Sequence, residues 1–518
     1  MNKLLGLILA VVLIFGMLVA CSDETDGTAD GGDTDTPSNN TESDSDNEIV
    51  NEEPLEISMI LPLFEEVPDM NNEYWTEFQE RTNTKLNIEW VPSGDFNTKF
   101  DLVLSSGALP DVLWAPNINS PSLLRAINNG AFWEIGQFLG DFSNYPNLKE
   151  NASPNAWRMM NMNGEIYGIG RNRPSIDQGI KIRKDWLDNL GLPVPTTLEE
   201  YADALEAMVK QDPNGTGRND TIGYVHSYGG TGIHDAFAVG FGAFDPAFDE
   251  DGGLIHFNMH PAYVETVGYF ADLYARGILP QEFASISRTQ TQELFESGQA
   301  ASYIRNIWRA WMFEESIKRH TPEAEVIVIE LEGPAGPAVM LESGVFGALM
   351  LSHELSEEKV LRILDYFEQT NSHEFFHDIF YGYEGIHHEL DDNGYPVMTE
   401  LGEVQIGSSV QQPLPLTYND WWKIVDKNAP EEYNERMLAD TEHYAEIGKV
   451  NPFSYLRSET WVDAWPRYQN EWETRVVEAI VGNITMDEFE EYIENLRNLP
   501  QFKESFQEFA EAYEAFWE

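Results

Sequence analysis

Leu-Glu-Ile-Ser-Met-Ile-Leu, residues 55–61, begins the stretch of the chain that decides the fold. Its apolar residues predict a strand, and residues 86–91 and 111–114 predict two more. The intervening residues 71–82 and 96–105 carry apolar side chains at helical spacing. Because strands that alternate with helices are typical of the α/β class, we expect a mainly parallel sheet.

A second block of the same kind begins near residues 179–183. Within it, Thr197 and Glu200 form a capping-box pattern, which predicts a helix that runs to about Lys210. The chain shows no internal repeat, and its 518 residues are enough for two or three packed units. Further helices are expected at residues 261–276, 290–297, 357–369 and, in an aromatic-rich tail, 463–518.

The N-terminus carries the pattern of an export signal, an apolar run that we assign to a signal peptide at residues 1–20. Residues 18–21, Leu-Val-Ala-Cys, resemble the bacterial lipobox, so we expect Cys21, the only cysteine of the chain, to carry acyl chains such as palmitate. Each buried methylene contributes about 0.8 kcal/mol, so two or three chains anchor a protein stably. The alternatives are an ordinary signal peptide with a stray cysteine, or a retained membrane helix. The expected location is the extracytoplasmic face of the cell membrane, by lipid anchor.

Acidic composition dominates the remainder of the chain. Residues 21–54 are rich in Asp, Glu, Ser, Thr and Asn and contain no Lys or Arg, which predicts a disordered linker behind the lipidated cysteine. The whole chain has a formal net charge of −58. Because nucleic-acid phosphates would be repelled by such a surface, we exclude nucleic acid as a partner.

A series of short motifs occurs in the order found in one family. They are residues 106–107 with 110–112, residues 163–169, residues 182–187 with 190–193, residues 195–200, residues 212–217 and residues 382–387. Together they resemble the extracellular solute-binding lipoproteins of carbohydrate ABC importers, the group that contains the LplA-type and alginate-binding proteins. The resemblance extends from about residue 55 to about residue 390.

The resemblance implies a two-lobed, periplasmic-binding-protein-like α/β fold with a hinge and a ligand cleft between the lobes. We expect one lobe at residues 55–172 plus 338–375 and the other at residues 173–337 plus 376–518. It also implies a monomeric receptor, not an enzyme, that captures an oligosaccharide and delivers it to the permease of an ABC transporter. A peptide or another small solute is the alternative ligand.

One polar loop has the spacing of a calcium site. Side-chain oxygens stand at positions 1, 3, 5 and 9 of the loop, on Asp212, Asn214, Thr216 and Asp220. Arg218 offers its carbonyl group at position 7, and Gly217 provides the sharp turn. Position 12 is Tyr224, so the bidentate Glu of an EF-hand is missing. We expect a structural Ca²⁺ here, and a metal-free polar turn is the alternative.

His373, Glu374 and His377 match the H-E-x-x-H pattern of zinc metalloproteases. A catalytic zinc usually has a third protein ligand, and none follows at a recognised spacing. Phe375 and Phe376, which lie within the motif, are typical of packing residues. An exported zinc metalloprotease or hydrolase is therefore the alternative from another class of protein.

The candidate ligand residues are aromatic and planar polar side chains, which suit the C–H patches and hydroxyl groups of sugars. Trp114 ends a predicted strand, at the edge where parallel sheets bind ligands. Arg171, Arg173 and Arg305 are placed to receive a uronate or another acidic ligand. The full set is Trp114, Asn117, Tyr167, Arg171, Arg305, Trp308, Trp311, Tyr381 and Glu384.

Overall fold

The computed structural model describes residues 53–517 except for 153, 163, 174, 177, 219, 227–230, 392–393, 395, 416–424 and 427–428. The expected signal peptide, the expected lipidation site Cys21 and nearly all of the acidic linker therefore lie outside the described residues. Within the described part, no helix is both long and apolar enough to cross a membrane.

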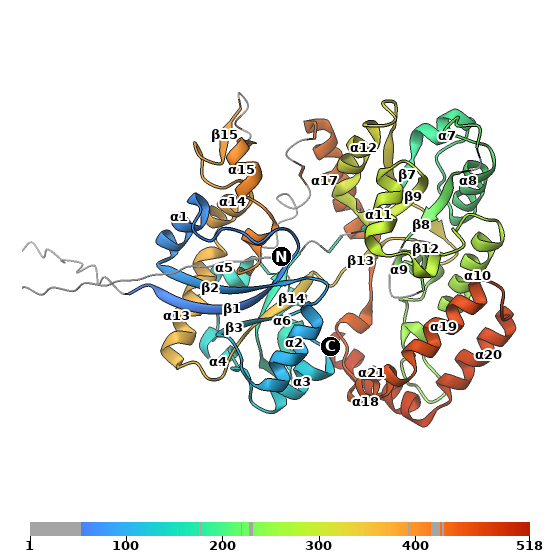
Figure 1. The fold of residues 1–518 in the computed structure, drawn as a ribbon. Helices are drawn as coiled ribbons and strands as arrows, with labels where there is room; N and C mark the ends of the chain where they lie inside the picture. Colours follow the sequence, from blue (N-terminus) through green and yellow to red (C-terminus); the bar gives the residue numbers. More distant parts are fainter. Residues whose placement is uncertain are drawn as a thin grey trace, which may run out of the picture. The chain divides into compact units, whose positions relative to one another are not determined.

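The first sheet has five strands in the order β2-β1-β3-β14-β6 (Figure 1). β1 (Leu55–Leu63) pairs in parallel with β2 (Thr84–Pro92) along its whole length and with β3 (Val112–Ala115) over a shorter stretch. β14 (Val345–Leu351) runs antiparallel to both β3 and β6 (Ile169–Asn172). The carboxyl ends of β1, β3 and β6 therefore meet at one edge of the sheet. The three N-terminal strands and the α/β class are confirmed.

Helix α1 (Glu73–Thr82) shows how local sequence sets an element of this lobe. The side chain of Asn72 accepts a hydrogen bond from the N–H of Trp75, and Asn83 ends the helix in the left-handed conformation. The buried face includes the aromatic residues Tyr74, Trp75 and Phe78, in agreement with the apolar spacing of residues 71–82. The other helices of this lobe are α2 (Phe96–Ser106), α3 (Pro121–Asn128), α4 (Gly136–Leu139), α5 (Pro146–Glu150), α6 (Pro154–Met160), α13 (Glu357–Thr370), α14 (His373–Tyr381) and α15 (Glu400–Gln405).

The second sheet has four strands in the order β10-β7-β9-β8. Its strands are β7 (Gln178–Arg183), β8 (Ile222–Val225), β9 (Ala300–Asn306) and β10 (Val326–Ile329). Only β8 and β9 pair in parallel, so this sheet, as far as the structure describes it, is mixed. The helices around it are α7 (Lys184–Leu190), α8 (Leu198–Lys210), α9 (Asp235–Phe241), α10 (Pro261–Ala275), α11 (Arg288–Glu296) and α12 (Ala310–Lys318).

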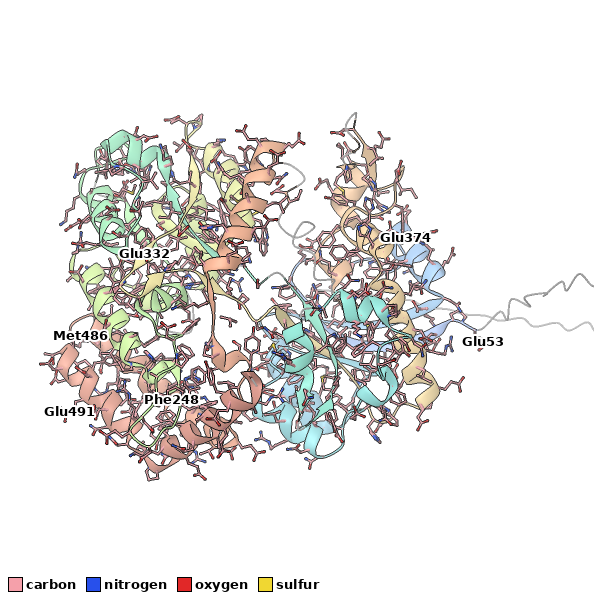
Figure 2. All side chains as sticks on the ribbon, turned by 180° about the vertical axis from the view of Figure 1, so that it is seen from behind. Glu53, Phe248, Glu332, Glu374, Met486 and Glu491 are labelled. Carbon is pink, nitrogen blue, oxygen red and sulfur yellow. The ribbon has the colours of Figure 1, made fainter. Side chains whose placement is uncertain are left out.

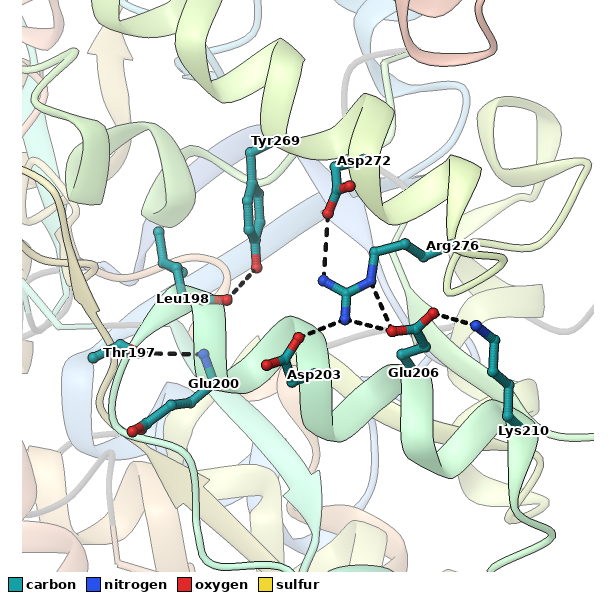
Figure 3. A network of polar contacts seen from close by, with 9 residues as sticks. All are labelled: Thr197, Leu198, Glu200, Asp203, Glu206, Lys210, Tyr269, Asp272 and Arg276. Atoms are coloured by element: carbon teal, nitrogen blue, oxygen red, sulfur yellow. Dashed lines mark hydrogen bonds and ion pairs between the residues drawn. The ribbon is translucent and has the colours of Figure 1, made fainter.

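Helix α8 begins at the expected cap and is tied to α10 by ion pairs (Figure 3). The Oγ1 of Thr197 accepts a hydrogen bond from the N–H of Glu200 at 3.1 Å. Arg276, which follows α10, donates at 2.7 Å to two carboxylates of α8, those of Asp203 and Glu206. The predicted helix and its end at Lys210 are confirmed.

Over the residues that the structure describes, the chain changes from one sheet to the other three times. It does so from β6 to β7, from β13 (Met340–Leu341) to β14, and between Leu414 in the first core and Tyr433 in a smaller cluster beside the second sheet. The buried Phe376, Ile379 and Val410 also pack in the first core. This differs from the sequence-based division, which placed residues 376–518 in the second lobe. A helical pattern shows that one face is buried, but not which core buries it.

The C-terminal helices α18 (Glu459–Ala464), α19 (Gln469–Ile480), α20 (Met486–Arg497) and α21 (Pro500–Trp517) pack against the second core, as the red segments of Figure 1 show. α17 (Glu431–Ile447) packs on the smaller cluster with α12. The short elements are β4 (Asn161–Met162), β5 (Glu165–Ile166), β11 (Glu332–Gly333), β12 (Gly336–Pro337), β15 (His388–Leu390), β16 (Pro396–Met398), β17 (Lys449–Val450), η1 (Phe257–Met259), η2 (Phe283–Ser285), η3 (Ile307–Arg309), η4 (Ser408–Gln411), η5 (Pro452–Ser454) and η6 (Trp465–Arg467).

Candidate functional site

A cavity of about 320 Å³ opens beside the segments that connect the two lobes. It lies at the carboxyl end of β3, the edge where α/β sheets bind ligands. Elements of both lobes contribute to its wall. The lining residues are Pro116, Asn117, Ile118, Asn119, Met159, His256, Phe257, Ser343, Val345, Gly347, Asn451, Phe453 and Ser454.

The backbone around Gly347 brings β14 close to β3. Gly347 has a φ of 76°, and a Cβ atom there would lie 2.5 Å from the carbonyl oxygen of Ala115 and 2.6 Å from Nε1 of Trp114. Only glycine fits such a position without displacing backbone. The pairing of β14 with β6 is irregular between Val345 and Ala348, and Val345 and Gly347 line the cavity at this irregularity.

Arg457 joins the C-terminal segment to the first lobe at the wall of the cavity. Its Nε donates to Oδ1 of Asn119 at 2.8 Å, and its two other guanidinium nitrogens donate to the carbonyl oxygens of Met159 and Asn161 at 2.7 Å each. Burial lowers the pKa of Arg457 to about 10, which still leaves it charged at neutral pH. The Asn119 amide is therefore held in one orientation, with its nitrogen 3.4 Å from the carbonyl oxygen of Ser454.

The second-lobe wall of the cavity is aromatic and uncharged. The ring of His256 stacks on Trp461, with centroids 3.8 Å apart, and lies 4.3 Å from the ring of Phe453. Burial lowers the pKa of His256 well below its ordinary value, so the imidazole is neutral. Its Nδ1 accepts a hydrogen bond from the N–H of Asn258 at 3.3 Å. Such a wall suits the C–H face of a sugar.

Of the candidate ligand residues, Asn117 is among those that line the cavity, and it is exposed. Trp114 is 5% exposed and packs edge-on against Phe96. Its Nε1 donates to the carbonyl oxygen of Phe346 at 3.2 Å. Trp114 thus belongs to the first core directly beneath the cavity and is not part of its surface.

Arg171 and Arg173 lie beside the cavity, around one aromatic ring. The guanidinium carbons of Arg171 and Arg173 are 5.6 Å and 3.4 Å from the centroid of Phe346. Phe346 stands between Val345 and Gly347, which both line the cavity. The first crossing between the lobes starts at Arg173.

The remaining candidates lie away from the cavity lining. Arg305, Trp308 and Trp311 follow one another on β9, η3 and α12, and both tryptophans pack on the smaller cluster beside the second sheet. The N–H of Trp311 donates to the hydroxyl of Tyr433 at 3.0 Å. In the first lobe, the hydroxyl of Tyr167 donates to Glu165 at 2.9 Å, Tyr381 is buried and Glu384 is exposed.

Sequence reasoning missed most of the residues that line the cavity. Those from the second lobe and the C-terminal segment are His256, Phe257, Asn451, Phe453 and Ser454. No motif marks them. Asn451, Phe453 and Ser454 belong to the segment after the third crossing between the lobes, whereas His256 and Phe257 belong to the segment between the first two crossings. Asn119, which follows the same strand end as Asn117, also lines the cavity.

The loop with calcium-like spacing brings the expected oxygens together. The Oγ1 of Thr216 lies 3.4 Å from Oδ1 of Asp212, 3.2 Å from Oδ1 of Asn214 and 3.1 Å from Oδ1 of Asp220. Asp212 also accepts the N–H groups of Thr216 and Gly217. These oxygen donors fit a hard cation.

Two features of the loop weaken its hold on a cation. The Nε of Arg218 lies 3.1 Å from Oδ2 of Asp220, so a positive side chain competes for one carboxylate. Only two carboxylates, those of Asp212 and Asp220, contribute among the described residues of the loop. Across the part of the chain that the structure describes, no group of three or more His, Cys, Asp or Glu residues is arranged to hold a metal.

The H-E-x-x-H motif lies on α14, with Glu374 at its surface (Figure 2). The Glu374 side chain is 78% exposed and pairs with Arg81 of α1 at 2.8 Å. The ring of His377 lies 5.2 Å from the ring of His388 and 5.3 Å from that of Tyr381. The glutamate is thus engaged in a surface ion pair, and one histidine of the motif lies among aromatic rings.

A model of the family described as bacterial extracellular solute-binding protein matches residues 67–347, more than half of the chain. The chain belongs to this family. Its members are solute-binding proteins, so this solute-binding protein is a receptor and not an enzyme. The alternative prediction of an exported zinc metalloprotease or hydrolase that uses Glu374 is therefore wrong.

Three proteins illustrate what this solute-binding protein is similar to. The polygalacturonan/rhamnogalacturonan-binding protein YtcQ of Bacillus subtilis is 26% identical over 98% of each chain. A solved structure of a solute-binding protein associated with an HMO-binding ABC transporter, from Bifidobacterium longum infantis, has a TM-score of 0.67 at 16% identity and covers 89% of this chain and 99% of that one.

The third is an EF-hand mutant of the ABC-transporter substrate-binding protein FusA of Streptococcus pneumoniae, solved in complex with fructo-nystose. It has a TM-score of 0.64 at 20% identity and covers 89% of this chain and 99% of that one. These structures confirm the two-lobed α/β fold that the sequence motifs implied.

Proposed function

We propose that this protein captures an oligosaccharide in the cleft between its lobes and delivers it to the permease of an ABC importer. The cavity at the carboxyl edge of the first sheet carries the proposal, because residues of both lobes line it. The names of the similar proteins support the ligand class, since polygalacturonan, fructo-nystose and HMO are glycans.

The geometry explains how a sugar would be held. Asn117 and Asn119 offer amide groups to hydroxyls, while the half-buried Phe453, backed by the buried His256, offers an aromatic surface to C–H patches. Because these groups come from different lobes, a bound sugar stabilises the conformation in which the lobes approach each other. The permease would then recognise the closed form.

Titration calorimetry against a panel of oligosaccharides tests this function, with short peptides as the comparison ligands. We expect one glycan class to bind with micromolar affinity or better and without hydrolysis, and small-angle scattering to show a smaller radius of gyration on binding. Binding of peptides but not of glycans would contradict the oligosaccharide, and turnover of the bound sugar would contradict a pure receptor.

We also propose that the loop of Asp212, Asn214, Thr216, Arg218 and Asp220 binds a structural Ca²⁺. The converging side-chain oxygens support this proposal, as does the EF-hand of FusA, the protein whose EF-hand mutant has a similar structure. Ca²⁺ would stabilise the loop that follows α8. Calcium should raise the melting temperature of the protein, and Asp212→Asn should abolish the increase. An equal increase with Mg²⁺ in both variants would contradict a specific site.

Anchoring through Cys21 belongs to the same proposal. The family is extracellular, and the acidic linker would hold the folded part away from the membrane surface. Cys21→Ala should release the protein from membranes into the soluble fraction, while a Ser22→Ala control stays bound. Light scattering of the purified chain tests the monomeric state that we expect, and a dimer mass would contradict it.

A further inference from the structure

Two arginines meet at the ring of Phe346. Arg173 stacks on the ring at 3.4 Å, and Arg171 approaches the same ring at 5.6 Å. Phe64, which is 47% exposed, lies 6.3 Å from Phe346. The result is a cationic group with an exposed aromatic side chain beside it, in a chain that has 89 acidic and 31 basic residues.

The hydrogen-bond partners of Arg171 are neutral. It is 1% exposed, and its guanidinium donates to Oε1 of Gln412 at 2.8 Å and to the carbonyl oxygen of Gln411 at 3.1 Å. Its Nε has no hydrogen-bond partner among the described residues. Burial, together with the like charge of Arg173, lowers the pKa of Arg171 to about 9. Within the described part of the chain, no carboxylate offsets this lowering of the Arg171 pKa.

Another fully buried arginine of the same chain provides an internal comparison. Arg183 is also 1% exposed, and Asp185 accepts from it at 2.8 Å and 2.6 Å in a two-pronged ion pair. A buried charge without a counter-charge is costly. Among the described residues, the hydrogen-bond partners of Arg171 include no carboxylate, unlike those of Arg183.

The group lies at the edge of the first sheet where α/β proteins bind ligands. Arg171 and Arg173 lie at the carboxyl end of β6, on the same sheet edge as the loop after β3. The N–H of Arg173 donates to the carbonyl oxygen of Gly344 at 2.9 Å, which holds the first two crossings together. Arg171, Arg173 and Phe346 are not among the residues that line the cavity, but Val345 and Gly347, the neighbours of Phe346 in sequence, are.

We propose that Arg171, Arg173 and Phe346 form a subsite for a carboxylate-bearing sugar, a uronate residue of the bound oligosaccharide. The half-buried Arg173 contacts the carboxylate, and Arg171 adds positive potential from behind the ring. Arginine matches the planar geometry of a carboxylate, and the exposed Phe64 offers its face to the sugar ring. The subsite rests on the proposed function, because it assumes that an oligosaccharide occupies the cleft.

Calorimetry with two matched probes tests this subsite: a galacturonate trimer and the same trimer with its carboxyl groups reduced to primary alcohols. The wild type should bind the charged trimer at least about tenfold more tightly, since hydrogen bonds between charged groups are the stronger ones. Arg173→Gln should remove most of that difference and leave the affinity for the reduced trimer unchanged. Arg319→Gln, an exposed arginine at the end of α12, removes the same charge and serves as the control.

Arg171→Lys is the second variant, because it keeps the charge at the more buried position. It should retain at least part of the preference for the charged trimer and report whether the fold tolerates the change. Equal binding of both trimers by the wild type, or an equal loss of both in Arg173→Gln, would overturn the subsite alone. If neither these trimers nor any glycan of the panel binds, the proposed function fails and the subsite fails with it.

Discussion

Replacing Arg457 with Met should weaken the attachment of the C-terminal segment to the first lobe. Arg457 donates to the side chain of Asn119 and to the carbonyl groups of Met159 and Asn161. Each of these partners lies about 300 residues or more away in the sequence. Methionine preserves much of the apolar stem but removes all three donors. The carbonyl group of Met159, a residue that is 7% exposed, then loses its partner.

The expected loss follows from two opposing contributions. Hydrogen bonds from a charged donor contribute about 1.5–3 kcal/mol each, so three contribute about 4.5–9 kcal/mol. Burial lowers the pKa of Arg457 well below its ordinary value, to about 10. At about 1.4 kcal/mol per pKa unit, this corresponds to an opposing cost on the order of 3 kcal/mol. Arg457→Met should therefore lower the free energy of unfolding by about 3 kcal/mol.

Urea unfolding of the ligand-free protein, followed by tryptophan fluorescence and circular dichroism, measures this loss. Arg457→Lys keeps the charge but not the planar fork, so its loss should be intermediate. Arg467→Met changes an exposed arginine of η6 and should shift the midpoint little. A change below about 1 kcal/mol in Arg457→Met, the lower range for a single bond, would refute the reasoning.

Four further outcomes are expected. The pKa of the buried His234 is lowered to about 3 from its ordinary 6.5, so the stability that its neutral form contributes is present above pH 6.5 and is lost as the pH falls. At pH 5 the share of the loss due to His234 should be about 2 kcal/mol, measured by urea unfolding as the difference between the wild type and His234→Asn. Trp114→Ala should lower the free energy of unfolding, measured by the same method, by about 3–5 kcal/mol. A loss of less than half of that would show that Trp114 is a surface contact instead. Glu374→Gln should change stability by less than about 1 kcal/mol, since its ion pair is exposed, and a larger change would show a buried role. The association rate of an anionic trimer, measured by stopped-flow fluorescence, should rise with salt because screening weakens repulsion by the net charge of −58, and a fall would contradict long-range repulsion.

Local sequence patterns predicted several helices correctly, because the interactions that form these helices join residues close together in the sequence. The helix expected at residues 71–82 is α1 (Glu73–Thr82), whose cap and aromatic face are neighbours in sequence. Likewise, the capping residues of α8 lie three positions apart. The placement of α14 in the first lobe was not predictable in this way, because its buried face meets a core formed by residues far away in the sequence.

The residues of the candidate site were likewise predictable only where local sequence places them. The rule that ligands bind at the carboxyl edge of a sheet identified the end of β3 and therefore Asn117. It did not tell which face of the strand end meets the cavity, and Trp114 points into the core instead. His256 and Phe453 carry no signal in sequence, since only the third crossing brings the segment of Phe453 to this wall.

The sequence by itself determined the α/β class, the export pattern, the acidic surface and, through ordered motifs, the family. These properties follow from composition and from spacing within short segments. Only the tertiary structure decided which residues meet in the cavity, that Arg457 fastens the C-terminal segment to Asn119, and that Arg171 and Arg173 share one aromatic ring. Those contacts join residues from distant parts of the chain, and local sequence does not specify the packing that brings them together.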